Sequence, residues 1–453
     1  MQSTYTLEQV ARYLDGHGEG PGVVGRRCLQ RTLLGVLLAG TLVLSEITRS
    51  LEERGSIRAR YKRLDRALGH YDFGPVASSQ TQRNCALVRD DDVICLDGSD
   101  IAKPFGRRFE ALAYVRDGSK KEIVPGYLLT TAVAVRPNRY DKNPLPLLLH
   151  PYSAAEEGFV SEPYEMHQAI EDLHRWTDGR GIFAIDRAAD SRRVLRKLLG
   201  LSHPFDVRLK AGKGCRHLLV EGRKILVRDL VDAVRFVAKI DLIRTAAGKR
   251  HPYHCSLGSF RVQLDGLEED GRPLWLVVSR STKHPEPMAL LTTLPADTAE
   301  QMIEVLKCYF ARWSVEEYHR FVKQSFGLEK VRVFKWARTK NLVHVAFLAS
   351  ALLASLHRLP GRMAARLRAS LVKKAELIHK RRSPSLLEVF NLYAYAAGLA
   401  ALLRKHIATL RRLWFRGRPT LPLRRLQSSR QLAFKILGQL LMGGDGPLVV
   451  NLS

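Results

Sequence analysis

The sequence is poor in three features that would place it in other classes of protein. Six cysteines are scattered along 453 residues without a Cys-x-x-Cys pair, which is typical of a reduced compartment rather than of a disulfide-stabilised secreted protein. The N-terminus is polar and has no basic stretch followed by an apolar core, so we expect no secretory signal. Two apolar stretches, 33–44 and 342–356, are too short to span a bilayer. We therefore expect buried helices there, and a cytoplasmic protein without a membrane partner.

Acidic residues are scarce relative to basic ones. The chain has 73 Lys and Arg against 45 Asp and Glu, a formal net charge of +28. So large an excess of one sign repels itself unless an anionic partner neutralises it. Nucleic acid fits this charge better than a membrane surface does. Basic residues gather in 26–66 and 373–425, the second range including Trp414 and Phe415, and we expect both regions to contact DNA.

The pattern of apolar residues divides the chain into three parts. Residues 1–75 have helical periodicity, and we expect helices at Thr6–Leu14, Arg31–Arg54 and Arg58–Leu68. From 76 to 356, apolar runs that predict buried strands alternate with amphipathic segments, and about 212–295 is a strand-rich insertion within this part. The strands expected before the insertion are Val93–Leu96, Phe109–Val115, Tyr127–Val135, Ile182–Ile185 and Phe205–Leu209. Those expected within it are Leu218–Val220, Lys224–Val227, Phe236–Ile240, Phe260–Leu264 and Leu274–Ser279. Residues 357–453 are helical and strongly basic. The order of strands and helices predicts an α/β core with a central sheet, flanked by helical regions at both ends.

Two of the predicted strands end in aspartate. Val93–Leu96 is followed by Asp97, and Ile182–Ile185 is followed by Asp186. The carboxyl ends of strands in an open α/β sheet form the crevice where ligands bind. Two adjacent carboxylates repel each other unless a cation lies between them, and hard oxygen ligands favour Mg²⁺ or Mn²⁺. Taken singly, either aspartate could merely open a turn or cap a helix, so the pair is the better evidence.

Four polar residues share one face of a helix predicted from Thr298 past Lys323. They are Tyr309, Arg312, Glu316 and Lys323, at offsets of 3, 7 and 14 from the first. At about 100° per residue these offsets fall within an arc of roughly 60°. Such a stripe can hold a metal with its carboxylate and DNA phosphates with its other groups. An ordinary solvated face with i,i+4 ion pairs has the same composition.

The spacing of these four residues resembles the Y-R-E-K signature of DDE transposases of the insertion-sequence-four family of bacterial mobile elements. The strings Leu96–Asp100 and Asp186-Arg187 resemble the family's first and second aspartate segments. The order agrees as well, with a β-rich insertion between the second aspartate and the glutamate. The resemblance covers roughly residues 85–355.

This resemblance implies an RNase H-like catalytic core that uses two divalent ions, Mg²⁺ with Mn²⁺ as a substitute. The residues that hold the metals and carry the catalysis would be Asp97, Asp186 and Glu316. Those that bind DNA phosphates would be Tyr309, Arg312, Lys323 and Arg187. The substrates would be double-stranded terminal inverted repeats and target DNA, read in part by the N-terminal helices. A homodimer is implied because each end needs one active site, and the protein would lie at the nucleoid of a bacterial cytoplasm.

Several assignments stay open at this point. Asp100 competes with Asp97, Asp190 with Asp186, and Glu317 with Glu316. In hairpin-forming relatives an aromatic residue of the insertion stacks on a base drawn from the duplex. The matching segment here offers Met288, and methionine fills cores more often than it wedges between bases.

Two rival functions and one rival metal also stay open. The rivals are a related nuclease that does not join strands and an inactive DNA-binding repressor. Zinc is a weak alternative, because the Cys and His residues of the insertion lack zinc-finger spacing: Cys215, His217, His251, His254 and Cys255.

Overall fold

The computed structural model describes residues 9–10, 13, 22–118, 120–136, 143–246, 249–264, 273–282, 286–379 and 391–408. The chain forms two compact units, Met1–Arg404 and Lys405–Ser453, and the account below concerns the first. The helix expected at Thr6–Leu14 lies mostly outside the described residues, as does the basic segment around Trp414.

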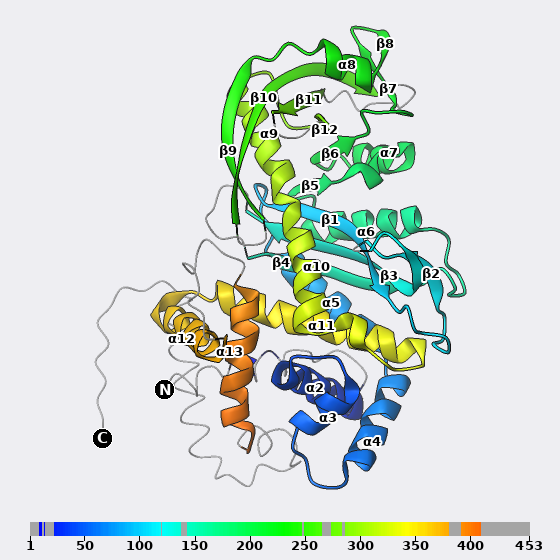
Figure 1. The fold of residues 1–453 in the computed structure, drawn as a ribbon, viewed down its shortest axis with the longest axis vertical. Helices are drawn as coiled ribbons and strands as arrows, with labels where there is room; N and C mark the ends of the chain where they lie inside the picture. The colour runs from blue at the N-terminus through cyan, green and yellow to red at the C-terminus, as the bar shows by residue number, and fades with distance from the viewer. Residues whose placement is uncertain are drawn as a thin grey trace. The chain divides into compact units, whose positions relative to one another are not determined.

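The centre of the molecule is a sheet with the strand order β4-β3-β1-β5-β6 (Figure 1). These strands are β1 (Val93–Ala102), β3 (Ile123–Val135), β4 (Leu145–Tyr152), β5 (Ile182–Ile185) and β6 (Phe205–Leu209). β1, β3 and β4 pair antiparallel, whereas β5 pairs parallel with β1 and with β6. Three antiparallel strands followed by two parallel ones give an RNase H-like core, so the expected α/β fold class is confirmed.

The insertion extends this sheet. Its elements are β7 (His217–Val220), β8 (Arg223–Leu226), α8 (Val227–Ala233), β9 (Ala238–Ala246), β10 (Lys249–Leu264), β11 (Leu274–Ser281) and β12 (Met288–Thr292). β12 pairs with β6, and β11, β10, β7 and β8 follow outward in that order. The strand expected at Phe236–Ile240 lies largely within the longer β9, and β12 was not expected. The predicted β-rich insertion is therefore continuous with the central sheet.

Helices cover both faces of the central strands. On one face lie α6 (Glu162–Thr177) and α7 (Arg192–Gly200), whose buried residues Ile170 and Leu195 share a core with Ile94 and Phe183. On the other face α9 (Ala299–Ala311) contacts β5 and β6, and α10 (Trp313–Ser325) contacts β1 and β3. Among the described residues there are two short 3₁₀ helices: η1 (Arg187–Ala189), whose Ala189 packs in the core with α6 and α7, and η2 (Leu328–Lys330), which contacts α10 and β1.

The remaining helices are α2 (Gly22–Ala39), α3 (Leu44–Ser50), α4 (Ile57–His70), α5 (Gly74–Cys85), α11 (Trp336–Arg358), α12 (Gly361–His379) and α13 (Leu392–Lys405). The single helix expected at Arg31–Arg54 is wrong: α2 and α3 are separated at Gly40, which has φ 66°, and bend by 90°. Within the described part of the chain, α11 is the one unbroken helix long and apolar enough to cross a membrane. Because 83% of its most apolar stretch is buried, it is the core helix predicted from the sequence.

Two further details differ from the sequence-based prediction. The strand expected at Phe109–Val115 is reduced to β2 (Ala113–Arg116), which pairs with the start of β3. β4 and α5 were not predicted, and they lie on either side of a cavity described below.

Candidate active site

Asp97 and Asp186 lie beside each other where the parallel pairing of β1 and β5 ends. The last paired residues are Leu96 and Ile185, so the next residue on each strand is an aspartate. β5 ends at that point, but β1 continues to Ala102 along β3. The expectation that Asp97 ends its strand is therefore wrong, because the antiparallel partner holds β1 extended for five more residues. The structure nevertheless brings the two carboxylates together.

Helix capping, the alternative role for these aspartates, applies to one carboxylate oxygen of Asp186. Oδ1 of Asp186 accepts a hydrogen bond from the backbone N–H of Ala188 at 2.7 Å and caps η1. Oδ1 of Asp97 accepts a bond from the N–H of Gly98 at 2.9 Å, but both residues lie within a strand rather than a turn. A cap therefore explains one oxygen of Asp186, and no turn explains Asp97.

The helix that carries the four-residue stripe is interrupted at Arg312. α9 ends at Ala311 and α10 begins at Trp313, so Tyr309 lies on the first helix and Glu316 on the second. The start of α9 is fixed by a reciprocal capping box between Thr298 and Gln301. The prediction of one continuous helix is wrong at this residue. The two helices run end to end across β5, β6 and β1 (Figure 1). Arg312, at their junction, lies 3.8 Å from Asp97.

Arg312 lies between two of the carboxylates. Its Nη1 is 3.8 Å from Oδ2 of Asp97, and its Nη2 is 2.7 Å from Oε1 of Glu316. The guanidinium carbon lies 5.7 Å from the centre of the Tyr309 ring, and the side chain is buried. Three of the four stripe residues are thus linked around one guanidinium, which here contacts carboxylates.

The pKa of Asp97 is shifted mainly by the burial of its carboxyl group. Burial raises the pKa of Asp97 to about 7, and the charges of Asp186 and Glu316 act in the same direction, although Arg312 and the N–H of Gly98 oppose them. A cation near these oxygens would favour the ionised carboxylate. The donor set, carboxylate oxygens only, is the one that Mg²⁺ or Mn²⁺ prefers. Within the described ranges no three His, Cys, Asp or Glu side chains are already placed to hold a metal ion, and Glu316 contacts Arg312.

The other predicted phosphate-binding residues lie at the margins. Nζ of Lys323 is 3.3 Å from Oδ1 of Asp100 and 3.1 Å from Oε1 of Glu329. Nη1 of Arg187 is 3.4 Å from Oε2 of Glu286, and both of these side chains are exposed. The structure therefore does not bring Lys323 or Arg187 into contact with the group formed by Arg312, Asp97, Glu316 and Tyr309.

The competing carboxylates are engaged elsewhere. Asp100 contacts Lys323, and Glu317 contacts Arg320 at 2.7 Å. Asp190 accepts bonds from the N–H of Lys210 and from Nε of Arg216 at 2.7 and 2.6 Å. These contacts join loops and helix turns, and the choice of Asp97, Asp186 and Glu316 over these neighbours stays a prediction.

Met288 is placed in the core rather than at a surface. It lies at the start of β12 opposite Ser279, and only 6% of its surface is exposed. It packs in the same apolar cluster as Trp275, Met302 and Tyr309. This packing favours the core-filling alternative for Met288.

Two residues of the site were not found from the sequence. Arg208 follows Val207, the partner of Ile185, so it lies next to Asp186 on the neighbouring strand. It also lies beside the Tyr309 phenol, where its charge, with that of Arg312, opposes the rise in the pKa of Tyr309 caused by burial. The alternation of β6, with Phe205, Val207 and Leu209 buried on one face, would have placed Arg208 on the other.

The second missed residue is His319. It follows Glu316 by three residues and precedes Lys323 by four, so helical spacing puts it on the same stripe. Burial lowers the pKa of His319 to about 3, helped by the charges of Lys323 and Arg312. His319 is therefore neutral, and its buried Nε2 has no hydrogen-bond partner among the described residues.

Comparison with known proteins identifies a family for this chain. A family model described as transposase DDE domain matches residues 89–352, more than half of the 453 residues. No curated protein matches the chain. Among solved structures, the chain is similar to one described as a cryo-EM structure of a piggyBac transposase synaptic complex with hairpin DNA. The TM-score is 0.44 and the identity 11%, covering 89% of this chain and 75% of that one. The match to residues 89–352 shows that the chain belongs to the transposase DDE-domain family.

Proposed function

We propose that this DNA transposase cuts at the terminal inverted repeats of its element and joins the ends to target DNA by two-metal phosphoryl transfer. We further propose that it is a member of the insertion-sequence-four family. One observation carries the proposal: Asp97 and Asp186 adjoin at the end of the β1–β5 pairing, opposite the helix junction that carries Glu316. A pair of carboxylates facing a third from a helix is suited to divalent ions and DNA phosphates.

The carboxylates of Asp97, Asp186 and Glu316 would hold two Mg²⁺ ions, with Mn²⁺ as a substitute. The bound ions would supply activation of the attacking hydroxyl and stabilisation of the leaving oxygen. Arg312 limits the repulsion between Asp97 and Glu316 by lying between them. Tyr309 fixes the position of Arg312 through its ring. Arg187, half exposed at the rim, and Lys323 would bind the phosphates that flank the cut.

The regions outside the core would bind DNA and a second copy. α4 exposes Arg58, Lys62, Arg63 and Arg66 along one surface, which supports a role for residues 1–75 in binding the element ends. Residues 357–453 would serve DNA contact or dimerisation, and residues 76–356 catalysis. We infer a homodimer in the synaptic complex and a location at the nucleoid of a bacterial cytoplasm.

The packing of Asp97 supports the catalytic proposal over the repressor alternative. Burying Asp97 next to two other carboxylates destabilises the folded protein, since each ionised group must lose water near a like charge. A protein that only occupies DNA ends gains nothing from that arrangement. The nuclease alternative has the same site, and it is separated from the transposase by the presence or absence of strand joining.

The test is cleavage of DNA that carries the inverted repeats flanking the gene, with Mg²⁺ or with chelator. Glu316→Gln should lower the cleavage rate by about 100-fold or more, a loss of about 2.7 kcal/mol of transition-state stabilisation. Glu317→Gln is the matched control, because this neighbour on α10 contacts Arg320 instead, and it should cut at the wild-type rate. If the wild type binds the repeats but never nicks them with either ion, the catalytic assignment is wrong. Cutting without joining to target DNA would identify the nuclease.

A further inference from the structure

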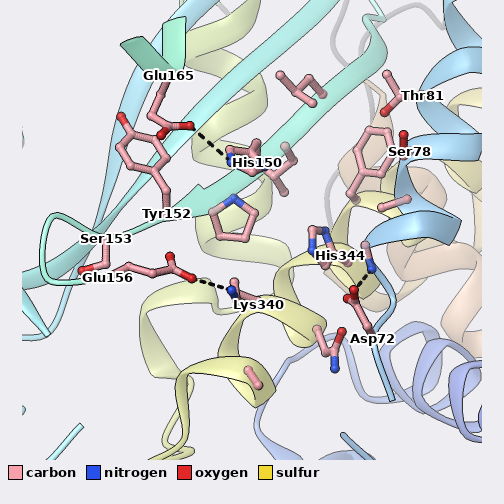
Figure 2. A pocket seen from close by; sticks show the side chains of 18 of the residues that line it. Asp72, Ser78, Thr81, His150, Tyr152, Ser153, Glu156, Glu165, Lys340 and His344 are labelled. Carbon is pink, nitrogen blue, oxygen red and sulfur yellow. Dashed lines mark hydrogen bonds and ion pairs between the residues drawn. The ribbon is translucent and has the colours of Figure 1, made fainter. Parts of the chain in front are cut away.

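A cavity of about 670 Å³ lies away from the candidate active site. It is bounded by α5, β4, α6 and α11, together with the loops that follow α4 and β4 (Figure 2). None of the residues assigned above to metal or phosphate binding lines it. Its volume falls within the range of about 300–1,000 Å³ that is usual for small-molecule sites.

The charge of the cavity is opposite to that of the chain. Its ionisable lining consists of acids, histidines and one lysine, and the acids are Asp72, Glu156, Glu157, Glu165 and Asp172. The lysine, Lys340, contacts Glu156 at 2.6 Å, as Figure 2 shows. In a chain with a formal charge of +28, this is a locally negative concavity. An anionic ligand is therefore disfavoured there.

Aromatic rings form much of the wall. Tyr152 and Phe159 stack with their centroids 6.0 Å apart, and Trp176 and Phe347 also line the cavity. Aromatic faces attract ammonium groups, and the attraction strengthens when the cation is desolvated. Carboxylates and ring faces together suit an organic cation better than a bare metal ion.

His344 supplies an unused polar atom. Its ring lies in the cavity near Asp72 (Figure 2), and its buried Nδ1 has no hydrogen-bond partner among the described residues. Burial, together with the charges of His150 and Lys340, lowers the pKa of His344 to about 4, although Asp72 opposes this. The ring is therefore neutral and adds no positive charge, while a buried polar atom without a partner costs stability.

We propose that this cavity binds a small organic polycation, a di- or polyamine whose ammonium groups reach the carboxylates while its methylene chain packs on the aromatic wall. Glu157 and Glu165 are the principal charge partners, because Glu156 is engaged by Lys340 and Asp172 contacts Arg175. Glu165 is only weakly engaged, 3.5 Å from Nε2 of His150. The inference is independent of DNA cleavage.

The test is isothermal titration of the full chain, without DNA, with spermidine. Non-specific attraction of a polycation to so basic a protein is unfavourable, so saturable binding to one site reports the cavity. The double variant Glu157→Gln/Glu165→Gln should weaken binding at least 10-fold. Both side chains reach solvent, so the amides are compatible with folding. Glu122→Gln, an exposed acid before β3, is the control and should bind like the wild type.

Three outcomes would overturn the proposal. These are the absence of saturable binding, equal affinity in the double variant, and Mg²⁺ binding that the same variant abolishes, which would identify a metal site. Cleavage by the double variant should equal that of the wild type. Failure of the polyamine site and failure of the proposed transposition are therefore separate results.

Discussion

At the scale of single residues, the buried Arg312 side chain lies between the carboxylates of Asp97, which is partly buried, and Glu316, which is exposed. The guanidinium touches both carboxylates, and the Tyr309 ring holds it from a third side. Arg208 lies on β6, next to Asp186 and beside the Tyr309 phenol. It adds a second positive charge beside the Tyr309 phenol, from a strand that lies outside the four-residue stripe.

We therefore predict that Arg208→Ala slows cleavage at the repeat boundary about 10- to 100-fold, the loss expected for an interaction worth about 1.4–2.7 kcal/mol in the transition state. Affinity for the repeats should stay within about twofold, because the other phosphate-binding groups are intact. Single-turnover cleavage and a gel-shift titration measure the two quantities. Arg196→Ala, on the exposed surface of α7, is the control. Equal losses of binding and cleavage would instead make Arg208 an ordinary DNA contact.

At the same scale, the buried Asp206 should make the stability of the protein depend on pH. It lies on β6 with no exposed surface, and neither carboxylate oxygen has a hydrogen-bond partner within the described residues. Burial raises the pKa of Asp206 well above its ordinary value. The folded state therefore keeps a proton that the unfolded state releases above about pH 4. Stability falls as the pH rises through this window, by up to about 1.4 kcal/mol per pH unit.

Asp206→Asn removes the ionisation, so the melting temperature of the variant should rise relative to wild type, with a difference that widens from pH 5 to pH 8. Differential scanning fluorimetry across this range measures it. Asp91→Asn, at an exposed turn, should show a constant difference. A gap between Asp206→Asn and wild type that does not change with pH would mean that the folded protein ionises Asp206.

At the scale of elements, the strands β5 and β6 were predicted with their observed bounds, because short apolar runs between turns identify buried strands. β4 and β12 were not. β4 contains Pro146 and Pro151, and β12 follows a segment with two prolines, so both lack the usual strand signal. The polar composition of β10 hid its length of 16 residues. Pairing with neighbours far along the chain, which one sequence does not reveal, decides these elements.

The site residues that depend on local sequence pattern could be predicted, and those that depend on pairing between distant strands could not. The residue after each parallel strand could be found from local pattern, whereas the continuation of β1 depends on β3. Helical spacing placed Arg312 and Glu316 on one face, but it did not reveal the break at Arg312, on whose two sides α9 and α10 contact different strands. Arg208 comes from a strand far from the stripe in sequence, and only the sheet order brings it to Asp186.

The loop that connects β1 to β2 is anchored at one end and exposes an aromatic side chain. Lys103 is buried and donates from Nζ to the carbonyl oxygens of Glu329 and Val331 at 2.6 and 2.9 Å, which anchors the loop at η2. Beyond this anchor Phe105 is 95% exposed and is followed by the exposed Arg107 and Arg108. An apolar side chain among arginines is suited to wedging into bent or unpaired DNA.

Phe105→Ala should therefore reduce the fluorescence increase of 2-aminopurine placed at the cut site, and slow cleavage several-fold, with the protein fold unchanged. Val160→Ala, at another exposed apolar residue, is the control. If Phe105→Ala leaves the 2-aminopurine signal as in wild type, the loop does not distort the DNA.

The contact of α12 with α13 gives another prediction at the element scale. A Cβ added at Gly398 would lie 2.1 Å from the carbonyl oxygen of Leu371, a backbone atom that cannot rotate away. Gly398→Ala should therefore destabilise the protein by about 1–3 kcal/mol through overpacking. Gly200→Ala, with no neighbouring atom within 4 Å, is the matched control in thermal unfolding. An unchanged melting temperature would mean that the two helices separate at little cost.

At the scale of the whole molecule, basic surface regions contrast with one acidic cavity. The net charge of +28 suits a long DNA duplex, and the exposed arginines of α4 and of the loop after β1 lie in separate parts of the chain. The locally acidic cavity beside α11 departs from this pattern. DNA affinity should therefore depend strongly on salt, while occupation of the cavity should not depend on DNA.

The last prediction concerns the number of copies that act together. One chain has one candidate Asp97–Asp186–Glu316 site, whereas an element has two ends, so the proposed homodimer would supply one site for each end. When wild type and Glu316→Gln are mixed in equal amounts before DNA is added, about a quarter of the synaptic complexes should contain two active copies. The fraction of molecules cut at both ends should then fall to about a quarter, with about half cut at one end, as measured on gels that resolve single-end and double-end products. The copies must exchange freely before DNA is added, which is verified by mixing two wild-type chains of different tag lengths. If instead a single copy, acting alone, cuts both ends of an element, about half of the DNA molecules should be cut at both ends and none at a single end.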